Sequence, residues 1–205
     1  MGININQIFH SLQGETSLAG FQSLFIRLGG CNLNCTYCDT AYAKSHENSK
    51  LMSIDEIMAI AAQYSFVHHI TITGGEPLIQ KEAFNLIRLL CDAFLVQVET
   101  NGSISITEGD RRARYIVDVK TPSSGQDNSF NFENISALSS NDEIKFVISD
   151  QTDYDFAKAF IFKYLIKTPA IINFSPVWEM TTRKIIEDKL NVRLNIQIHK
   201  LMGFE

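Results

Sequence analysis

The stretch Ser23-Leu-Phe-Ile-Arg-Leu-Gly-Gly-Cys31-Asn-Leu-Asn-Cys35-Thr-Tyr-Cys38 joins a short apolar run to three cysteines that lie within eight residues. The run at 23–28 has the length and composition of a buried strand. Three thiolates in the loop that follows can reach one metal centre. A four-iron cluster held by only three cysteines keeps one iron open to a small molecule. The stretch therefore predicts a strand that leads into an open iron–sulfur site.

A zinc site is the alternative for the same three thiols. Closed zinc sites have four ligands, so a histidine would have to complete the set, namely His46, His68, His69 or His199. The fourth cysteine, Cys91, falls in a helical pattern and is expected to be a small buried apolar residue.

Strand and helix patterns alternate along the chain. Apolar, β-branched runs predict strands at 23–28, 69–73, 95–99, 115–119, 143–148, 170–174 and 193–198; helical periodicity predicts helices at 53–64, 81–93, 153–166 and 181–190; polar stretches predict loops at 44–50 and 121–134. Ser53 and Glu56 have the spacing of a capping box at the start of the first helix. The alternation indicates parallel βα units. Because a complete eight-unit barrel takes about 250 residues, the 205 residues of this chain predict an α/β fold that is an incomplete TIM-type barrel of about six to seven mainly parallel strands.

Composition narrows the class of protein. Apolar residues make up 45% and charged residues 20% of the chain, which is typical of a globular domain. No apolar run is long enough for a membrane span, and the N-terminus lacks the pattern of a secretory signal. The net charge of −5 argues against general nucleic-acid binding, and clustered free thiols favour a cytoplasmic, reducing location.

Distinctive motifs follow the predicted strands. They are Gly74-Gly-Glu-Pro77, Glu99-Thr-Asn-Gly102, Asp118-Val-Lys120 and Phe174-Ser-Pro-Val177. Ligand-binding residues in α/β folds gather at the carboxyl ends of parallel strands. We therefore expect these motifs to meet the cysteine loop at one rim of the barrel.

The cysteine spacing followed by Gly-Gly-Glu-Pro resembles the radical S-adenosylmethionine (SAM) superfamily. That resemblance implies a 4Fe-4S cluster bound by Cys31, Cys35 and Cys38. It also implies SAM chelated to the open iron and cleaved to a 5′-deoxyadenosyl radical. The cofactors would supply the chemistry, and the protein would bind and orient them.

Further motifs resemble the 7-carboxy-7-deazaguanine synthase family of the queuosine and 7-deazapurine pathway. They are Leu12-Gln-Gly-Glu15, Cys38-Asp-Thr40 and the C-terminal Gln197-Ile-His-Lys-Leu-Met-Gly203. The resemblance implies a lyase that converts 6-carboxy-5,6,7,8-tetrahydropterin to 7-carboxy-7-deazaguanine, with release of ammonia and a requirement for Mg²⁺. It also implies one domain over 1–205, in which a radical SAM core carries an N-terminal substrate-binding extension and a C-terminal tail.

The same resemblance assigns residues to ligands. For SAM these are Tyr37, Cys38, Asp39, Gly75, Asp118, Val119, Lys120, Phe174, Ser175, Pro176 and Val177; for the pterin they are Leu12, Gln13, Gly14, Arg27, Thr73, His199 and Glu205; for Mg²⁺ it is Thr40. Arg27 suits the pterin carboxylate because its guanidinium is planar and always charged, and His199 would assist it. The Asp118 motif departs from the Ser-Pro-Lys of many family members. Glu15, Glu99 and Asn101 have no assigned role.

Two alternatives remain open at this point. A glycyl-radical enzyme activase shares the small size and the cysteine spacing. A zinc-binding structural module would use the same thiols but would catalyse no reaction. For the synthase, the expected partners are the pterin, a reductant protein such as a flavodoxin or ferredoxin, and a second copy of the chain in a homodimer. No nucleic acid or membrane partner is expected.

Overall fold

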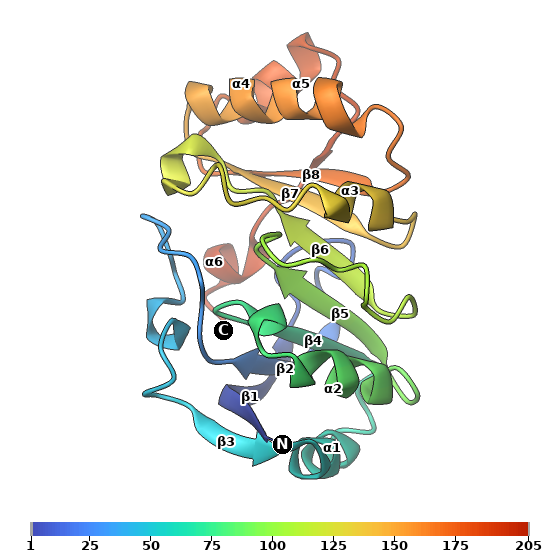
Figure 1. Cartoon of the computed structure of the whole chain (residues 1–205). Helices are drawn as coiled ribbons and strands as arrows, with labels where there is room; N and C mark the ends of the chain where they lie inside the picture. Colours follow the sequence, from blue (N-terminus) through green and yellow to red (C-terminus); the bar gives the residue numbers. More distant parts are fainter. Residues whose placement is uncertain (1, 205) are drawn as a thin grey trace.

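A single curved sheet is the frame of the molecule (Figure 1). The structure is a computed structural model that describes residues 2–204, and within them the nine strands have the order β3-β1-β2-β4-β5-β6-β7-β8-β9. The strands are β1 Gly2–Leu12, β2 Gln22–Leu28, β3 Lys50–Ser53, β4 His69–Gly74, β5 Leu95–Thr100, β6 Arg114–Asp118, β7 Glu143–Ile148, β8 Ile171–Pro176 and β9 Arg193–Leu194. From β2 to β9 every pairing is parallel, and β1 pairs antiparallel with both β2 and β3.

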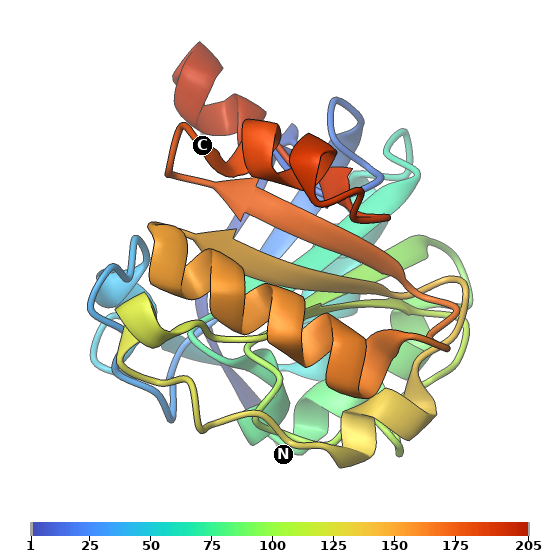
Figure 2. The ribbon, with the colours of Figure 1, turned by 90° about the horizontal axis from the view of Figure 1, so that it is seen from above.

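Helices cover the outer face of the sheet, as Figure 2 shows for α4 and α5 beside the last strands. The α-helices are α1 Ile54–Gln63, α2 Glu82–Leu90, α3 Glu133–Ala137, α4 Gln151–Phe160, α5 Thr181–Glu187 and α6 Ile198–Met202; 3-10 turns lie at Ala41–Ala43, Pro77–Ile79 and Pro122–Ser124, and a π-helical turn at Ile161–Leu165 extends α4. The predicted capping box is confirmed, because Ser53 and Glu56 exchange side-chain to backbone hydrogen bonds at the start of α1.

The core lies between the sheet and these helices. Alternate strand residues that point outward, such as Ile26, Ile72, Val98 and Phe146, are almost completely buried there. The other half of each strand points to the concave face. Because the side-chain period of a strand is two, one set of strands supplies both an apolar core and a second surface that is available for polar chemistry.

The predicted mainly parallel, incomplete barrel is confirmed, with all seven predicted strands present. Antiparallel β1 and β3 raise the described total to nine. The last strand was predicted too long: only Arg193–Leu194 pairs with β8, and α6 starts at Ile198. The backbone N–H of Asn195 still donates to the Phe174 carbonyl of β8, while its side chain accepts a bond from the loop after β1. The predicted loop 121–134 contains a 3-10 turn, which Pro122 starts, and the first residues of α3.

A loop that follows β1 fills the inside of the open barrel. Its Thr16 is 1% exposed: the hydroxyl donates to Gln97, and the backbone N–H donates to Asn195. The backbone N–H of Ser17 donates to buried Glu143 on β7. This segment, residues 13–20, is called the plug loop below. It brings the N-terminal part of the chain against the last strands, so both flanking segments take part in the site.

Candidate active site

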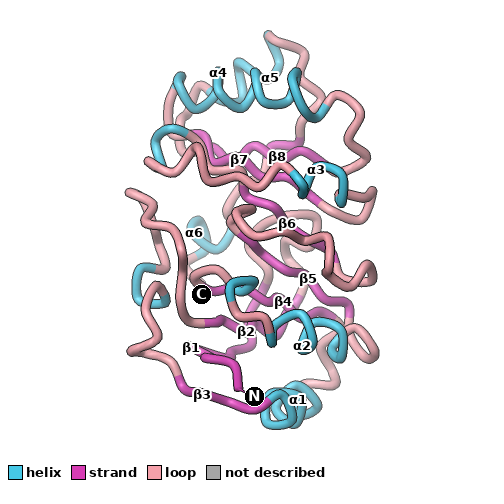
Figure 3. The backbone as a smooth tube through the Cα atoms, viewed as in Figure 1, coloured by secondary structure: helices cyan, strands magenta, loops and turns pink. Residues whose placement is uncertain are grey.

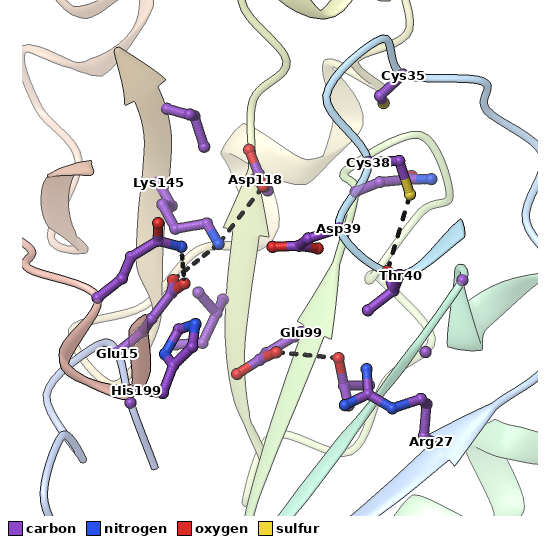
Figure 4. A pocket seen from close by; sticks show the side chains of 18 of the residues that line it. Glu15, Arg27, Cys35, Cys38, Asp39, Thr40, Glu99, Asp118, Lys145 and His199 are labelled. Carbon is purple, nitrogen blue, oxygen red and sulfur yellow. Dashed lines mark hydrogen bonds and ion pairs between the residues drawn. The ribbon is translucent and has the colours of Figure 1, made fainter. Parts of the chain in front are cut away.

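Inward-facing residues of five neighbouring strands line one large pocket. Arg27, Thr73, Glu99, Asp118 and Lys145 come from β2, β4, β5, β6 and β7 in turn, and each points to the concave face. The cavity has a volume of about 660 Å³, within the range of small-molecule sites. Figure 4 shows the charged side chains around it.

The cysteine loop closes one end of this pocket. It belongs to the long connection between β2 and β3, which Figure 3 shows as loop interrupted by one short helix. Cys31, Cys35 and Cys38 are free thiols, half-buried, and all three line the pocket. Burial raises the pKa of Cys35, although the nearby charge of Lys120 opposes this rise.

Hydrogen-bond donors already face the sulfur of Cys31. The backbone N–H of Leu33 lies 3.4 Å from it and the Asn101 side-chain amide lies 3.9 Å from it. Donors to sulfur suit a thiolate ligand. Among residues 2–204, no three His, Cys, Asp or Glu side chains converge on a point that could hold one metal ion. In a four-iron cluster each cysteine binds a different iron, so thiols spread around one end of a pocket fit such a cluster.

The Gly-Gly-Glu-Pro turn packs directly on the start of that loop. The backbone N–H of Glu76 donates to the carbonyl of Gly30, and a Cβ on Gly75 would collide with the same carbonyl. The Glu76 side chain is fully buried and accepts bonds from the backbone N–H groups of Leu78 and Asn101 and from the Thr100 hydroxyl. Glu76 thus ties the glycine turn to the end of β5, which leaves Gly75 to line the pocket.

A chain of buried opposite charges crosses the pocket floor. Lys145 Nζ lies 3.0 Å from Glu15 Oε2 and 3.5 Å from Asp118 Oδ2, and Lys120 Nζ lies 3.0 Å from the same Asp118 oxygen. Burial raises the pKa of Glu15, but the charge of Lys145 and hydrogen bonds from Gln197 and Lys145 bring it to about 2. The second oxygen of Asp118, Oδ1, is buried without a partner among the described residues. An unpaired buried acceptor is costly, so Asp118 is ready to accept a ligand hydroxyl.

Glu99 makes no ion pair with that chain of charges and is held by neutral groups among the described residues. It accepts hydrogen bonds from Gln13, from Gln97 and from the hydroxyl of Thr73, at 3.0–3.2 Å. Burial raises its pKa, and Lys145 opposes the rise. Glu99 is therefore a pocket-lining carboxyl group whose acceptor oxygens are held in place by neutral donors.

Arg27 lies on the far side of the pocket from the plug loop (Figure 4). Its guanidinium stacks over the ring of Phe9 at 5.3 Å and faces Tyr42 at 5.6 Å. Its Nε is buried with no hydrogen-bond partner among the described residues. A fixed cation with an unused donor is suited to an anionic ligand group.

The C-terminal segment covers the pocket near the plug loop. The His199 ring packs on Gly14 so closely that a Cβ there would collide with it, and Ile198 N–H donates to the Gly14 carbonyl. Lys200 forms an exposed ion pair with Asp39 of the cysteine loop at 3.3 Å. His199 lies beside Glu15, across the pocket from Arg27, so the two are not adjacent (Figure 4). Glu205 lies outside the described residues.

Most predicted site residues line the pocket. They are Leu12, Gln13, Gly14, Arg27, Cys31, Cys35, Tyr37, Cys38, Asp39, Thr40, Thr73, Gly75, Asp118, Lys120, Val177 and His199. The backbone of Gln13 is already bonded to Phe21 and Gly20, so its contribution to the pocket comes through the side-chain amide that supports Glu99.

Four predicted SAM contacts are absent from the pocket lining. Val119 and Phe174 are fully buried in the core, and Ser175 accepts a hydrogen bond from Asn195 inside the barrel. Pro176 does not line the pocket either. The reason is that β8 extends to Pro176, so strand alternation turns Phe174 outward where a loop had been expected.

Sequence reasoning missed Lys145 and Gln197 and left Glu15, Glu99 and Asn101 without a role, although all five line the pocket. Lys145 had a readable signal, since it is a charged residue between the apolar Ile144 and Phe146 of a predicted strand. Gln197 had none, because its place depends on where β9 ends.

The comparisons with known proteins agree with this geometry. A family model described as the radical SAM superfamily matches residues 25–163. A 7-carboxy-7-deazaguanine synthase from Koribacter versatilis is 37% identical, over 98% of this chain and 96% of the relative. Synthases of the same name from Chlorobaculum tepidum and Methanospirillum hungatei are 37% and 38% identical, over 97% and 98% of this chain and 93% and 86% of the relatives.

A solved structure supports the same assignment. The crystal structure of QueE from Escherichia coli superposes with a TM-score of 0.80 at 25% identity, over 96% of this chain and 94% of that one. The agreement therefore extends over nearly the whole chain. This chain belongs to the 7-carboxy-7-deazaguanine synthase family of the radical SAM superfamily.

Proposed function

We propose that this chain converts 6-carboxy-5,6,7,8-tetrahydropterin to 7-carboxy-7-deazaguanine and releases ammonia. The observation that carries the proposal is that one cavity is lined by two sets of residues. The free thiols and Lys120 suit the cluster and SAM, and Arg27, Glu99 and the plug loop suit the pterin. When bound, the cluster and SAM supply the 5′-deoxyadenosyl radical that starts the reaction.

The SAM half is formed by the cysteine loop, the glycine turn and the end of β6. Gly75 offers backbone close to the cysteine loop, where it suits the amino group of the methionine moiety. Lys120 offers a buried cation for the carboxylate, and the free oxygen of Asp118 suits a ribose hydroxyl. Tyr37 and Val177 provide apolar surface for the adenine.

The pterin half is formed by β2, β4, β5 and the plug loop. Arg27 would bind the substrate carboxylate, since its guanidinium is buried, fixed between two rings and without an ion-pair partner among the described residues. Glu99, which is bonded to the Thr73 hydroxyl next to Arg27, would accept hydrogen bonds from ring N–H and amino groups of the pterin. His199 closes the wall above Gly14, and its position favours a contact to the ring over a shared contact with Arg27.

Thr40 is the protein ligand that we propose for Mg²⁺. It precedes the turn Ala41–Ala43 and makes no side-chain capping bond, and its hydroxyl lies 3.8 Å from Cys38 Sγ. One hydroxyl together with substrate oxygens and waters suits a cation that takes few protein ligands.

The remaining proposals concern the surroundings of the enzyme. The radical chemistry needs a one-electron donor, which we take to be a flavodoxin or ferredoxin, and we propose a homodimer in a cytoplasmic setting. The free thiols of the described chain fit a reducing compartment. Among residues 2–204, no helix is long and apolar enough to cross a membrane.

An anaerobic assay tests the reaction. Reconstituted protein is incubated with SAM, a reductant, Mg²⁺ and the carboxytetrahydropterin, and the deazaguanine and 5′-deoxyadenosine are measured by mass spectrometry. We expect both products, in amounts that depend on the pterin. Cleavage of SAM without any deazaguanine would reject the substrate assignment, and a colourless protein that holds one zinc would support the structural-module alternative. The relatives above are named synthases, and no observation here favours the glycyl-radical activase.

A further inference from the structure

Lys145 is a charged residue between two apolar residues of strand β7, two positions after Glu143. On β7 its neighbours Ile144 and Phe146 are fully buried in the outer core, while Lys145 points to the concave face. Burying a lysine here requires compensation, since an unpaired buried charge is strongly unfavourable. The compensation comes from two carboxylates on two different sides of the pocket.

The first partner is Glu15 of the plug loop. Its Oε2 accepts a hydrogen bond from Lys145 Nζ at 3.0 Å, and Gln197 of the C-terminal segment donates to its other oxygen. Glu15 is thus the point where the plug loop, β7 and the segment before α6 meet. These elements also position Gln13, Gly14 and His199, which are the plug-loop and tail contributions to the pterin half.

The second partner is Asp118 at the end of β6. Lys145 Nζ lies 3.5 Å from Asp118 Oδ2, the oxygen that also binds Lys120. Asp118 and Lys120 are the charged residues of the SAM half. One ammonium group therefore lies between a carboxylate of each half-site, with the side chains of Lys145, Glu15 and Asp118 all at most 16% exposed.

We propose that Lys145 is a positioning residue that orients Glu15 for the pterin half and Asp118 for the SAM half, so that both half-sites depend on one shared cation. Three further titratable groups face this arrangement: Glu99 from β5, Lys120 after β6 and His199 from α6. Of these, Glu99 strengthens the hold on Lys145, and Lys120 competes with Lys145 for Asp118.

The inference rests on the proposed function for the identity of the pterin. The effect of Lys145 on SAM binding is measured independently of that identity. Lys145→Met and Lys145→Gln remove the charge, and Lys145→Arg keeps it. Lys158→Met is the matched control, because Lys158 forms an ion pair with Asp188 that lies outside the pocket. Each variant is reconstituted anaerobically, and iron content and circular dichroism establish that it is loaded and folded.

Equilibrium binding of SAM and of the carboxytetrahydropterin is then measured separately from pH 5.5 to 8.5. We expect the neutral variants to bind each ligand ~10-fold more weakly, because a buried pair has been broken. We expect them to form more 5′-deoxyadenosine per deazaguanine than the native enzyme does. The arginine variant should stay within ~3-fold of the native enzyme in both affinities. The Lys158→Met control should have the affinities of the native enzyme.

The pH dependence separates positioning from a general loss of structure. Without Lys145 the pKa of buried Glu15 rises, so the ratio of variant to native pterin affinity should fall as the pH decreases from 8 to 5.5. The ratio removes the titration of the free substrate, which is the same in both measurements. Adding Glu15→Gln to either neutral variant should abolish that slope.

The measured affinities and product ratios can contradict the role of Lys145 in two ways. Native affinities and a native product ratio in the neutral variants would overturn the inference, and so would a pH-independent loss that Glu15→Gln leaves unchanged. If the native enzyme binds SAM but not the pterin, the proposed function fails while the SAM measurement still tests Lys145. If Lys145→Met does not fold, the same affinities are measured with Lys145→Gln and with the double variant Lys145→Met, Glu15→Gln. The double variant leaves no unpaired charge at Glu15.

Discussion

The buried glutamates Glu15 and Glu76 differ widely in the pKa of their carboxyl groups. The pKa of Glu15 is about 2, because Lys145 and Gln197 outweigh its burial, whereas burial raises the pKa of Glu76 to about 7 in spite of three hydrogen-bond donors. Glu15 therefore stays charged at neutral pH, and Glu76 titrates there. The nearest cation, rather than burial itself, decides which state a buried glutamate adopts here.

The cysteines give the most direct residue-scale prediction. Replacing Cys31, Cys35 or Cys38 by Ala should abolish iron loading and SAM cleavage, because two remaining thiolates do not hold a three-ligand cluster. Cys91→Ala is the control: this half-buried thiol follows α2 on the outer side of the sheet, and its loss should cost only about 1 kcal/mol of stability. Iron content and cleaved SAM are the measurements. A requirement for Cys91 in iron binding would contradict the three-ligand site.

Thr40 provides a test of the metal proposal. Thr40→Ala should weaken the stimulation of turnover by Mg²⁺ while iron content stays normal, since the hydroxyl is not needed to cap the following turn. Thr40→Ser keeps the oxygen and should keep the response. Turnover titrated with Mg²⁺ in both variants measures the effect, and an unchanged titration in Thr40→Ala would remove Thr40 from the metal site.

Glu76 makes stability depend on pH. A carboxyl group whose pKa is higher in the folded state binds its proton more tightly there, so its contribution is full below about pH 4.5 and is lost as the pH rises through about 7. The free energy of unfolding of the native protein minus that of Glu76→Gln should therefore fall by on the order of 3 kcal/mol between pH 4.5 and 8. Urea unfolding of both proteins at several pH values measures it. A difference that rises with pH would show that Glu76 is ionised in the fold.

At the scale of elements, the central strands were predictable because their apolar runs are unambiguous. Five of the seven predicted strands agree with the structure to within one residue at each end, namely 23–28, 69–73, 95–99, 115–119 and 143–148. The two at the end of the chain were less accurate. β9 stops at Leu194, before Asn195 and Gln197, whose side chains bond distant residues in a way that no local pattern reveals. β8 continues to Pro176, two residues beyond the prediction, so Phe174 lies in the core and not in the predicted SAM site.

The segment after α6 yields an element-scale prediction. Phe204 lines the pocket and packs against His199, so deleting residues 203–205 should raise the KM for the pterin markedly while uncoupled SAM cleavage persists. Steady-state kinetics with both products quantified test this, with Leu201→Ala on the exposed side of α6 as the control. A truncated enzyme with native KM would show that the tail has no contact with substrate.

At the scale of the whole molecule, the barrel is open, and the plug loop compensates for the missing strands. The cysteine ligands and their rim position followed from sequence, since they depend on local order and on the parallel sheet. The polar interior did not, because Thr16, Gln97, Glu143 and Asn195 meet only when the sheet curves around the plug loop. Sequence therefore identified the chemistry of the site better than the framework that holds it.

Asn195 tests this dependence on the plug loop. It accepts the Thr16 backbone N–H at 2.7 Å and donates to Ser175 at 2.8 Å, and it is 1% exposed. Asn195→Ala should lower the free energy of unfolding by about 2 kcal/mol because buried groups lose their partners. It should also raise the KM for the pterin, since the plug loop carries Gln13 and Gly14. Thermal unfolding and kinetics measure the two effects, and lost stability with an unchanged KM would separate the plug loop from substrate binding.

The bond between Glu15 and Gln197 spans 182 positions of the chain, so the ribosome makes its two partners at widely separated times. Ribosomes add about 5–20 residues per second, so the about 160 residues from Cys38 to Gln197 take roughly 8 to 30 seconds to make. Glu15 is therefore synthesised long before its partner, and a chain that stops short of residue 197 lacks the bond that joins the two ends of the site. The complete pocket thus forms only when nearly the whole chain has been translated, because its lining runs from Phe9 to Phe204.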